Sequence, residues 1–229
     1  MDFIVAGIVK AFQLLVQGDR ETYSAVLATV KVSSLSMTVS LLIGIPLGYC
    51  LGYADFPGRR SIRTMVDTML SLPTVFIGLL VYAFISNRGP LGEYGLLFTL
   101  SGIAVGQAIL ALPIVIALTA TAVESLDRPL RLTLLSLGAS GRQIFLTSIW
   151  EARLGLLVAA VTATGRVLTE VGISMMVGGN IKWHTRTITT AIALETNKGQ
   201  FATGIALGLV LLAIAFAVNL SLSFLRRRA

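Results

Sequence analysis

Long apolar runs separated by short polar or basic segments dominate the sequence. The runs of spanning length cover residues 22–53, 62–86, 95–124, 152–177 and 200–225. At about 1.5 Å per residue, a helix of this length crosses a hydrocarbon layer of about 30 Å. The pattern therefore predicts an all-α integral membrane protein with about five transmembrane helices.

Proline interrupts each of the first three runs, at Pro46, Pro73 and Pro113. Proline has no backbone N–H and leaves a carbonyl group without its helical partner. In a membrane, another helix or a water-lined cavity has to satisfy such a carbonyl. We expect the run at residues 62–86 to be broken in its middle at Pro73.

Two shorter segments are also expected to be helical but not to span the membrane. Residues 1–17 are interrupted by Lys10, and residues 1–21 are predicted to form an interfacial helix at the N-terminus. Its apolar face is Ile4, Val5, Ile8, Phe12, Leu15 and Val16. Residues 187–197 are too short to cross, which places them at the outer surface or in a re-entrant segment. The start of the chain has no basic leader, so a cleaved signal peptide is not expected.

The longest break between spanning runs, residues 125–153, has the pattern of two helices joined by a glycine. Asp127 is a candidate helix cap, and Gly138 is a candidate helix stop. Ser140 and Gln143 have the spacing of a capping box, which predicts a second helix. The segment also carries Arg128, Arg131, Arg142 and Arg153. We interpret it as a basic cytoplasmic docking element for another protein; two surface helices lying on lipid headgroups are the alternative.

Composition supports the membrane class and excludes several others. The chain has 229 residues, of which 55% are hydrophobic and 13% charged, whereas soluble domains are about one quarter charged. The net charge of +7 comes largely from arginines beside apolar runs, so it indicates topology and not nucleic-acid binding. Cys50 is the single cysteine, which excludes an intramolecular disulfide and a cysteine-based metal site.

The basic residues predict the orientation of the chain in the membrane. On one side lie Arg59, Arg60, Arg63, Arg128, Arg131, Arg142, Arg153 and Arg226 to Arg228. Fewer lie on the other side, namely Lys10, Arg20, Arg88, Lys182, Arg186 and Lys198. Because cytoplasmic segments are richer in Lys and Arg, residues 125–153 and the basic tail 226–229 are predicted to be cytoplasmic. The N-terminus is then outside, and residues 22–225 form the transmembrane domain.

The fourth run contains the ionisable residues Arg166 and Glu170. Their i, i+4 spacing puts them on one face of a continuous helix, where they are able to pair. Ionisable groups inside a membrane usually face a bundle interior or an aqueous path. Two interpretations stay open: a path for a compact anion, and a structural ion pair. Thr162, Thr169 and Ser174 add hydroxyl groups, and Met175 and Met176 are candidates for an apolar constriction.

Several segments resemble the permease subunits of ABC importers. Leu137-Gly138-Ala139-Ser140 is similar to the centre of their cytoplasmic coupling loop, although Leu132-Thr133-Leu134 stands where that loop usually has Glu-Ala-Ala. Leu72-Pro73-Thr74-Val75 and residues 165–181 resemble the oxyanion branch of these permeases. Residues 185–199 look most like its tungstate-type members.

The resemblance implies a homodimeric pore with two docked ATPase subunits and an extracytoplasmic oxyanion-binding protein that delivers tungstate. ATP and Mg belong to the partner ATPase, and no cofactor, metal site or catalytic residue is expected in this chain. The sequence also lacks a phosphate-binding glycine loop followed by Lys-Ser or Lys-Thr. The implied docking residues are Leu134, Leu137, Gly138, Ala139 and Ser140. The implied path residues are Arg166, Thr169, Glu170, Ser174, Met176, Gly178, Gly179 and Asn180.

Other functions compete with this one. Molybdate and sulfate are tetrahedral dianions like tungstate, so a permease for either is an alternative. A stand-alone anion channel or secondary carrier is a second alternative, although the halves of the chain show no inverted repeat. A membrane scaffold without transport is a third. The expected location is the cytoplasmic (inner) membrane of a bacterium or archaeon, crossed several times.

Overall fold

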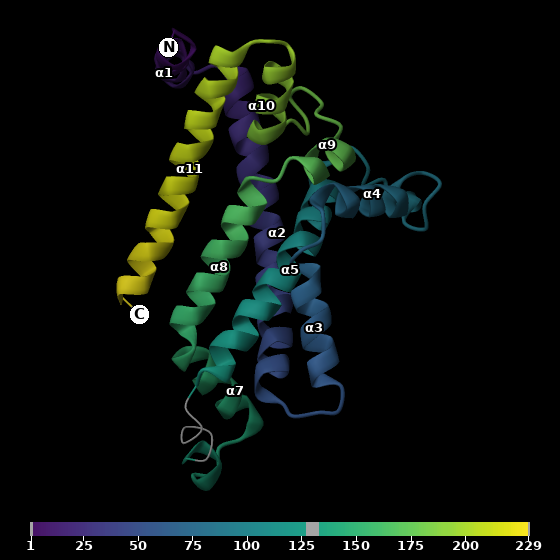
Figure 1. The fold of residues 1–229 in the computed structure, drawn as a ribbon, viewed down its shortest axis with the longest axis vertical. Coiled ribbons are helices and arrows are strands. Elements are labelled where there is room, and N and C mark those ends of the chain that lie inside the picture. Colours follow the sequence, from purple (N-terminus) through teal and green to yellow (C-terminus); the bar gives the residue numbers. More distant parts are fainter. Residues whose placement is uncertain (1, 127–132, 229) are drawn as a thin grey trace.

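The described part of the chain is a bundle of helices without strands. The computed structural model describes residues 2–126 and 133–228. Its three longest helices are α2 (Arg20–Tyr53), α5 (Leu100–Glu124) and α11 (Phe201–Arg228). In Figure 1, α2 and α11 run along the long axis of the molecule, and α5 crosses α2 at a small inclination. Among the described helices, α2, α5 and residues Phe201–Ser221 of α11 are long and apolar enough to cross a membrane alone.

The α2–α5 pair forms the centre of the bundle because α2 presents glycines to α5. A Cβ atom on Gly48 would lie 2.6 Å from Thr119 Cβ and 2.7 Å from the carbonyl oxygen of Ile116. Gly44 and Gly52 are equally close to α5. The Gly-x-x-x-Gly spacing of these residues allows two helices to approach closely, either within one chain or between two chains. In the structure they serve the contact within the chain.

Replacing Gly48 by leucine is expected to separate α2 from α5 and to lower the yield of folded protein. A side chain forced into a packed interface costs about 1–3 kcal/mol, and backbone cannot move aside as a flexible side chain can. Gly208 on α11 is the matched control, because a Cβ atom there meets nothing within 4 Å. Thermal unfolding in detergent should show a lower transition temperature for Gly48→Leu and an unchanged one for Gly208→Ala. Equal stability of the two variants would contradict the assigned contact.

The second apolar run forms two helices with a sharp bend between them. α3 (Arg59–Met69) and α4 (Thr74–Ile85) are bent by 100° relative to one another, and Pro73 is the N-cap of α4. The break expected at Pro73 is therefore confirmed. The direction of the second half was not predicted: α4 leaves the bundle sideways in Figure 1.

The fourth apolar run is also divided, and here the expectation of one helix over residues 152–177 is wrong. α7 (Gly141–Glu151) and α8 (Arg153–Leu168) are bent by 67°. α8 ends at Leu168, and α9 (Gly172–Gly178) begins after three non-helical residues. Thr169 and Val171 in this break are β-branched, which lowers helix propensity. If each bent pair counts as one span, the described chain has up to five spans, the number predicted.

The third run starts later than predicted. α5 begins at Leu100 and not at Gly95, because the Thr99 side chain accepts a hydrogen bond from the Gly102 N–H and caps the helix there. The preceding residues 86–99 form a turn with the short 3-10 helix η1 (Gly92–Tyr94). Phe98 in this turn has a positive φ of 59°, and its N–H donates to the Val177 carbonyl of α9.

The N-terminal helix α1 (Asp2–Val16) lies across the end of α11. Figure 1 shows α1 nearly end-on while α11 runs along the page. Gly7 and Ala11 pack inward, and the Lys10 ammonium donates to Thr203 Oγ1 at 2.6 Å. The predicted apolar face points away from the protein: its residues Ile4, Val5, Ile8, Phe12, Leu15 and Val16 are exposed. The helix is thus confirmed, and its exposed apolar face has the form of an interfacial helix.

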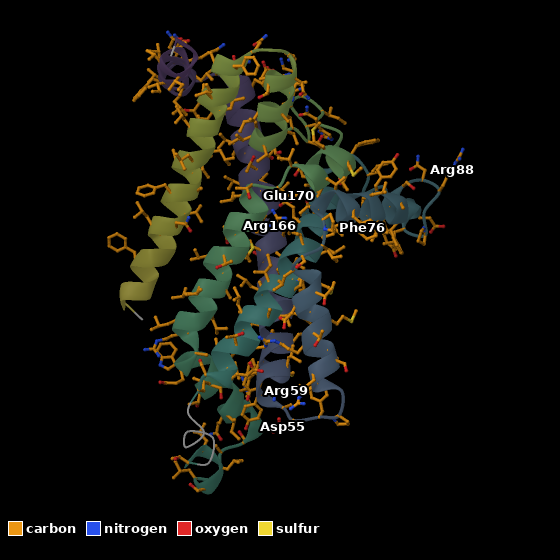
Figure 2. The ribbon with its side chains drawn as sticks, in the orientation of Figure 1. Asp55, Arg59, Phe76, Arg88, Arg166 and Glu170 are labelled. Carbon is orange, nitrogen blue, oxygen red and sulfur yellow. The ribbon has the colours of Figure 1, made fainter. Side chains whose placement is uncertain are left out.

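At the opposite end of the molecule, Arg59 at the start of α3 contacts the C-terminal ends of α2 and α5. Arg59 donates to the α2 carbonyls of Leu51 and Gly52, and to Glu124, the last residue of α5, at 2.6 Å. It also pairs with Asp55 (Figure 2). These contacts satisfy carbonyls at the C-terminus of α2, where a cation is favourable. Glu124, the residue before segment 125–153, is therefore held in place by Arg59.

Candidate functional site

The exposed face of α8 carries the polar residues that the sequence singled out in this run. Thr162, Arg166 and Thr169 are all exposed, whereas Ala163 and Val167 on the other face are buried against the bundle. Figure 2 places Arg166 near the end of α8, where the chain passes toward α9. Within the described residues, Arg166 has no ion-pair partner.

A guanidinium without a carboxylate is costly next to lipid in a membrane-spanning helix. Its five N–H donors and the neighbouring hydroxyl groups suit a compact oxyanion, which accepts several charge-assisted hydrogen bonds. The face of α8 that carries Arg166 is therefore suited to line a water-filled space and to attract anions.

Glu170 does not pair with Arg166, contrary to the pairing that a continuous helix would allow. Because α8 ends at Leu168, the two residues do not share a helix face. Glu170 is 2% exposed, and its Oε1 accepts from the Ile173 N–H at 3.0 Å. The Thr169 hydroxyl bonds backward to the Gly165 carbonyl at 3.0 Å. The break thus separates an exposed cation from a buried carboxylate.

Ser174 belongs to a buried polar network and not to an open surface in this conformation. Its hydroxyl donates to the Glu170 carbonyl and accepts from Gln107 Nε2 on α5 at 3.4 Å. Gln107 Oε1 in turn accepts from Ser36 on α2 at 3.4 Å. Met176 is half-buried and Gly178 is buried. The structure therefore brings Arg166 and Thr169 to one exposed face and places Glu170, Ser174 and Gly178 inside.

Gly179 and Asn180 lie in a loop that is held from several sides. Both have positive φ, 68° for Gly179 and 50° for Asn180. Asn180 Oδ1 accepts from Arg186 Nε at 3.1 Å, and Arg186 forms an ion pair with Glu21 of α2. Lys182 also pairs with Glu21, at 2.7 Å. This loop and α10 (Ile188–Asn197) lie at the same end as α1 (Figure 1).

The helix–glycine–helix pattern predicted for residues 125–153 is confirmed where the structure describes it. Residues 133–136 are helical, and Gly138 has φ +71°. The Ala139 N–H donates to the Leu134 carbonyl at 3.0 Å, a bond typical of a helix stop. Ser140 and Gln143 form the expected capping box at the start of α7. The predicted cap Asp127 lies outside the described residues.

The surface around Gly138 is apolar and unusually exposed. Leu137 is 76% exposed, and Leu134 and Ala139 are half-buried. Sequence reasoning missed Leu146 and Trp150, which are 54% and 67% exposed on α7. Their i, i+4 spacing, opposite the buried Ile144 and Ser148, was the available signal. Exposed apolar side chains of this kind are typical of protein–protein interfaces.

A family model described as "Binding-protein-dependent transport system inner membrane component" matches residues 44–229. The match includes α8, the break after it and the segment around Gly138. The chain belongs to this family.

This chain is also similar, over nearly its whole length, to individual permease proteins. It is 50% identical over 227 residues to the tungstate uptake system permease protein TupB of Campylobacter jejuni, with 99% of this chain and 95% of that protein covered. It is 31% identical over 206 residues to the molybdenum transport system permease protein ModB of Escherichia coli K12, covering 86% and 89%. As a family member, the chain is a transport permease subunit and not an enzyme.

Solved structures of ABC transporters share the fold. A bacterial ABC transporter involved in the import of the acidic polysaccharide alginate matches with a TM-score of 0.76 at 19% identity, covering 97% of this chain and 82% of that chain. At this identity, the likeness concerns the fold alone.

Proposed function

We propose that this chain is the membrane-spanning permease subunit of an ABC importer for tungstate. It forms the translocation path, a separate ATPase subunit drives it, and an extracytoplasmic oxyanion-binding protein delivers the substrate. The observation that carries the proposal is the exposed Arg166 on α8, which has no ion-pair partner among residues 2–126 and 133–228, in a chain 50% identical to a tungstate permease. A guanidinium on an exposed helix face favours a tetrahedral dianion over cations and neutral solutes.

We propose tungstate as the substrate in place of molybdate or sulfate, because this chain is 50% identical to the tungstate permease and 31% identical to the molybdenum permease. Competition for uptake tests this choice. Radiolabelled tungstate would be offered to proteoliposomes that contain the complete transporter, with unlabelled tungstate, molybdate or sulfate in excess. We expect unlabelled tungstate to suppress uptake most strongly. Stronger suppression by molybdate or sulfate would reassign the substrate.

The path is proposed to lie between two copies of the chain. One copy leaves the face with Thr162, Arg166 and Thr169 uncovered, although a guanidinium without an ion-pair partner is costly against lipid. A second copy related by a two-fold axis would cover this face and supply a second Arg166. The dianion would then meet two cations, which matches its charge.

Cysteine cross-linking is expected to detect this pairing. A Thr162→Cys variant made in a Cys50→Ser background has its single thiol on the uncovered face of α8. A short bifunctional maleimide should join two copies in the assembled transporter. Leu212→Cys is the control, because Leu212 is 64% exposed and belongs to a different helix, α11. Equal cross-linking at both positions, or none at Thr162→Cys, would contradict the proposed interface.

The orientation is proposed with the N-terminus outside and the C-terminus in the cytoplasm. The arginines Arg59, Arg63, Arg142 and Arg153 belong to the end of the molecule that carries α7, and Lys182, Arg186 and Lys198 belong to the end that carries α1 and α10 (Figure 1). The more basic end is cytoplasmic by the positive-inside rule. The membrane is the cytoplasmic membrane of a bacterium or archaeon.

Docking of the ATPase is proposed at the surface around Gly138. Leu134, Leu137, Gly138, Ala139 and Ser140 would contact the ATPase, and the exposed Leu146 and Trp150 enlarge this surface. ATP and Mg bind to the ATPase. Segment 125–153 follows Glu124, which accepts a hydrogen bond from Arg59. At its other end, the segment continues directly into α8, which carries Arg166. A displacement of the segment would therefore act on the path helix and on the ends of α2 and α3.

A further inference from the structure

We propose that Glu170 is a positioning residue, which holds α9 in place at the α10 end of the bundle by accepting hydrogen bonds. The negative charge of its carboxylate is not used in this role. This inference rests on the proposed transport function. It replaces the expectation that Glu170 lines the path or pairs with Arg166. No comparison assigns a role to this residue.

The carboxylate of Glu170 caps the start of α9. Oε1 accepts from the Ile173 N–H at 3.0 Å, one of the amide groups that have no partner inside a helix. Glu170 is 2% exposed, and a Cβ atom on Gly172 would lie 3.2 Å from its Oε1, so the carboxylate is closely surrounded. Its position is therefore fixed by neighbours on several sides.

The backbone of Glu170 connects α9 to α10. Its carbonyl accepts from the Ser174 hydroxyl at 3.3 Å and from the Thr189 hydroxyl at 2.9 Å. Thr189 is buried on α10, and Ser174 is buried on α9. One residue thus joins the break after α8, the short helix α9 and the outer helix α10.

α9 completes the packed outer end of the bundle. Ile173 and Val177 are fully buried in one cluster with Ile85 of α4 and Ile103 of α5. At its C-terminal end, the Val177 carbonyl accepts from the Phe98 N–H at 2.9 Å, and the Gly178 carbonyl accepts from the Thr185 hydroxyl. The N-terminal end is held by Glu170. Loss of the Glu170 hydrogen bond should therefore loosen the start of α9 and leave its C-terminal end attached.

The lack of an ion pair to Glu170 within the described part of the chain argues for hydrogen bonding over charge. Among the described residues, no Lys, Arg or His forms an ion pair with it, and Arg166 points to the exposed face instead. A carboxylate that served the anion path would also repel a dianion. Capping the Ile173 N–H needs only an oxygen acceptor, which a neutral amide supplies.

Glu170→Gln and Glu170→Ala separate these roles. Glutamine keeps the oxygen acceptor and removes the charge, whereas alanine removes both. We expect Glu170→Gln to keep uptake within about twofold of the unmodified protein. Glu170→Ala should lower ATP-driven uptake by about fivefold, the factor for about 1 kcal/mol of lost capping, and should allow ATP-independent leak of tungstate. Impairment of Glu170→Gln equal to that of Glu170→Ala would overturn the proposal, as would normal behaviour of Glu170→Ala.

Hydrogen–deuterium exchange of the α9 amides supplies a readout that does not depend on substrate. In purified transporter, the amides of residues 172–178 should exchange faster in Glu170→Ala and at the original rate in Glu170→Gln. If the unmodified protein transports no dianion, the proposed function fails, but this exchange pattern still tests the role of Glu170. If Glu170→Ala does not assemble, Thr189→Val tests the same joint from α10, and unchanged α9 exchange in it would count against the proposal.

Thr196→Val is the matched control for the α10 variant. Among the described residues, the Thr196 hydroxyl donates only to the Ile192 carbonyl of its own helix, and the side chain is exposed. We expect this variant to leave α9 exchange and tungstate leak unchanged. An equal effect of Thr196→Val and Thr189→Val would show a general loosening of α10 and would contradict the joint at Glu170.

Discussion

Arg166→Ala is expected to lower ATP-driven tungstate uptake by about ten- to hundredfold while the transporter still assembles. Hydrogen bonds that involve a charged group contribute about 1.5–3 kcal/mol each, and this guanidinium is the charged group on the exposed face of α8. The side chain has no ion-pair partner in the described residues, so its removal breaks no internal ion pair. Uptake in proteoliposomes, normalised to the amount of complex, measures the effect.

Two further variants make the Arg166 prediction specific. Arg166→Lys keeps the charge but loses the planar fork of donors, so it should be intermediate. Arg88→Ala removes an exposed arginine of the turn after α4, far from α8 in Figure 2, and should leave uptake unchanged. Loss of assembled complex in Arg166→Ala would favour a structural role for this arginine. Normal uptake in the same variant would remove Arg166 from the path.

Gly138→Trp and Gly138→Asp are expected to uncouple ATP hydrolysis from uptake without preventing membrane insertion. Gly138 has φ +71°, where a residue with a Cβ atom costs about 1–2 kcal/mol, and nothing lies within 4 Å of its Cβ position. The new side chain therefore projects from the proposed docking surface and obstructs a partner. ATP hydrolysis and tungstate uptake, measured on the same proteoliposomes, give the number of ATP molecules used per ion.

Gly141→Ala and Gly138→Ala are the controls for this second prediction. Gly141 also has open space around its Cβ position, but no positive φ, so its alanine variant should remain coupled. Gly138→Ala introduces the backbone strain without the bulk, so it separates distortion of the loop from obstruction of the ATPase. A coupled Gly138→Trp variant would place the ATPase elsewhere.

Much of the architecture was predictable because membrane helices follow directly from apolar run length. Thr22–Tyr53 became α2 with nearly the expected bounds, and the capping box at Ser140 gave the start of α7. Both helices depend on local chemistry. The length of the apolar run gives α2, and side-chain hydrogen bonds to the backbone give the start of α7. The bend at Pro73 was predictable as a break for the same reason.

The direction of α4 was not predictable because it depends on packing between distant helices. The break at residues 169–171 was not predictable because the β-branched Thr169 and Val171 lower helix propensity only slightly. Apolar composition is the same whether α4 continues α3 or turns by 100°. Similarly, Arg166 and Glu170 have the spacing of a helical pair, and only the contacts of Glu170 with Ile173 and Thr189 show that they separate. A spacing argument therefore selected residues at the site but gave the wrong relation between them.

ATP-dependent uptake tests the central claim most directly. The chain would be reconstituted with its cognate ATPase and binding protein, and tungstate entry followed with ATP, without ATP and with the ATPase omitted. We predict entry only when all components and ATP are present. Entry that persists without the ATPase would contradict the importer function and would point to a channel or secondary carrier.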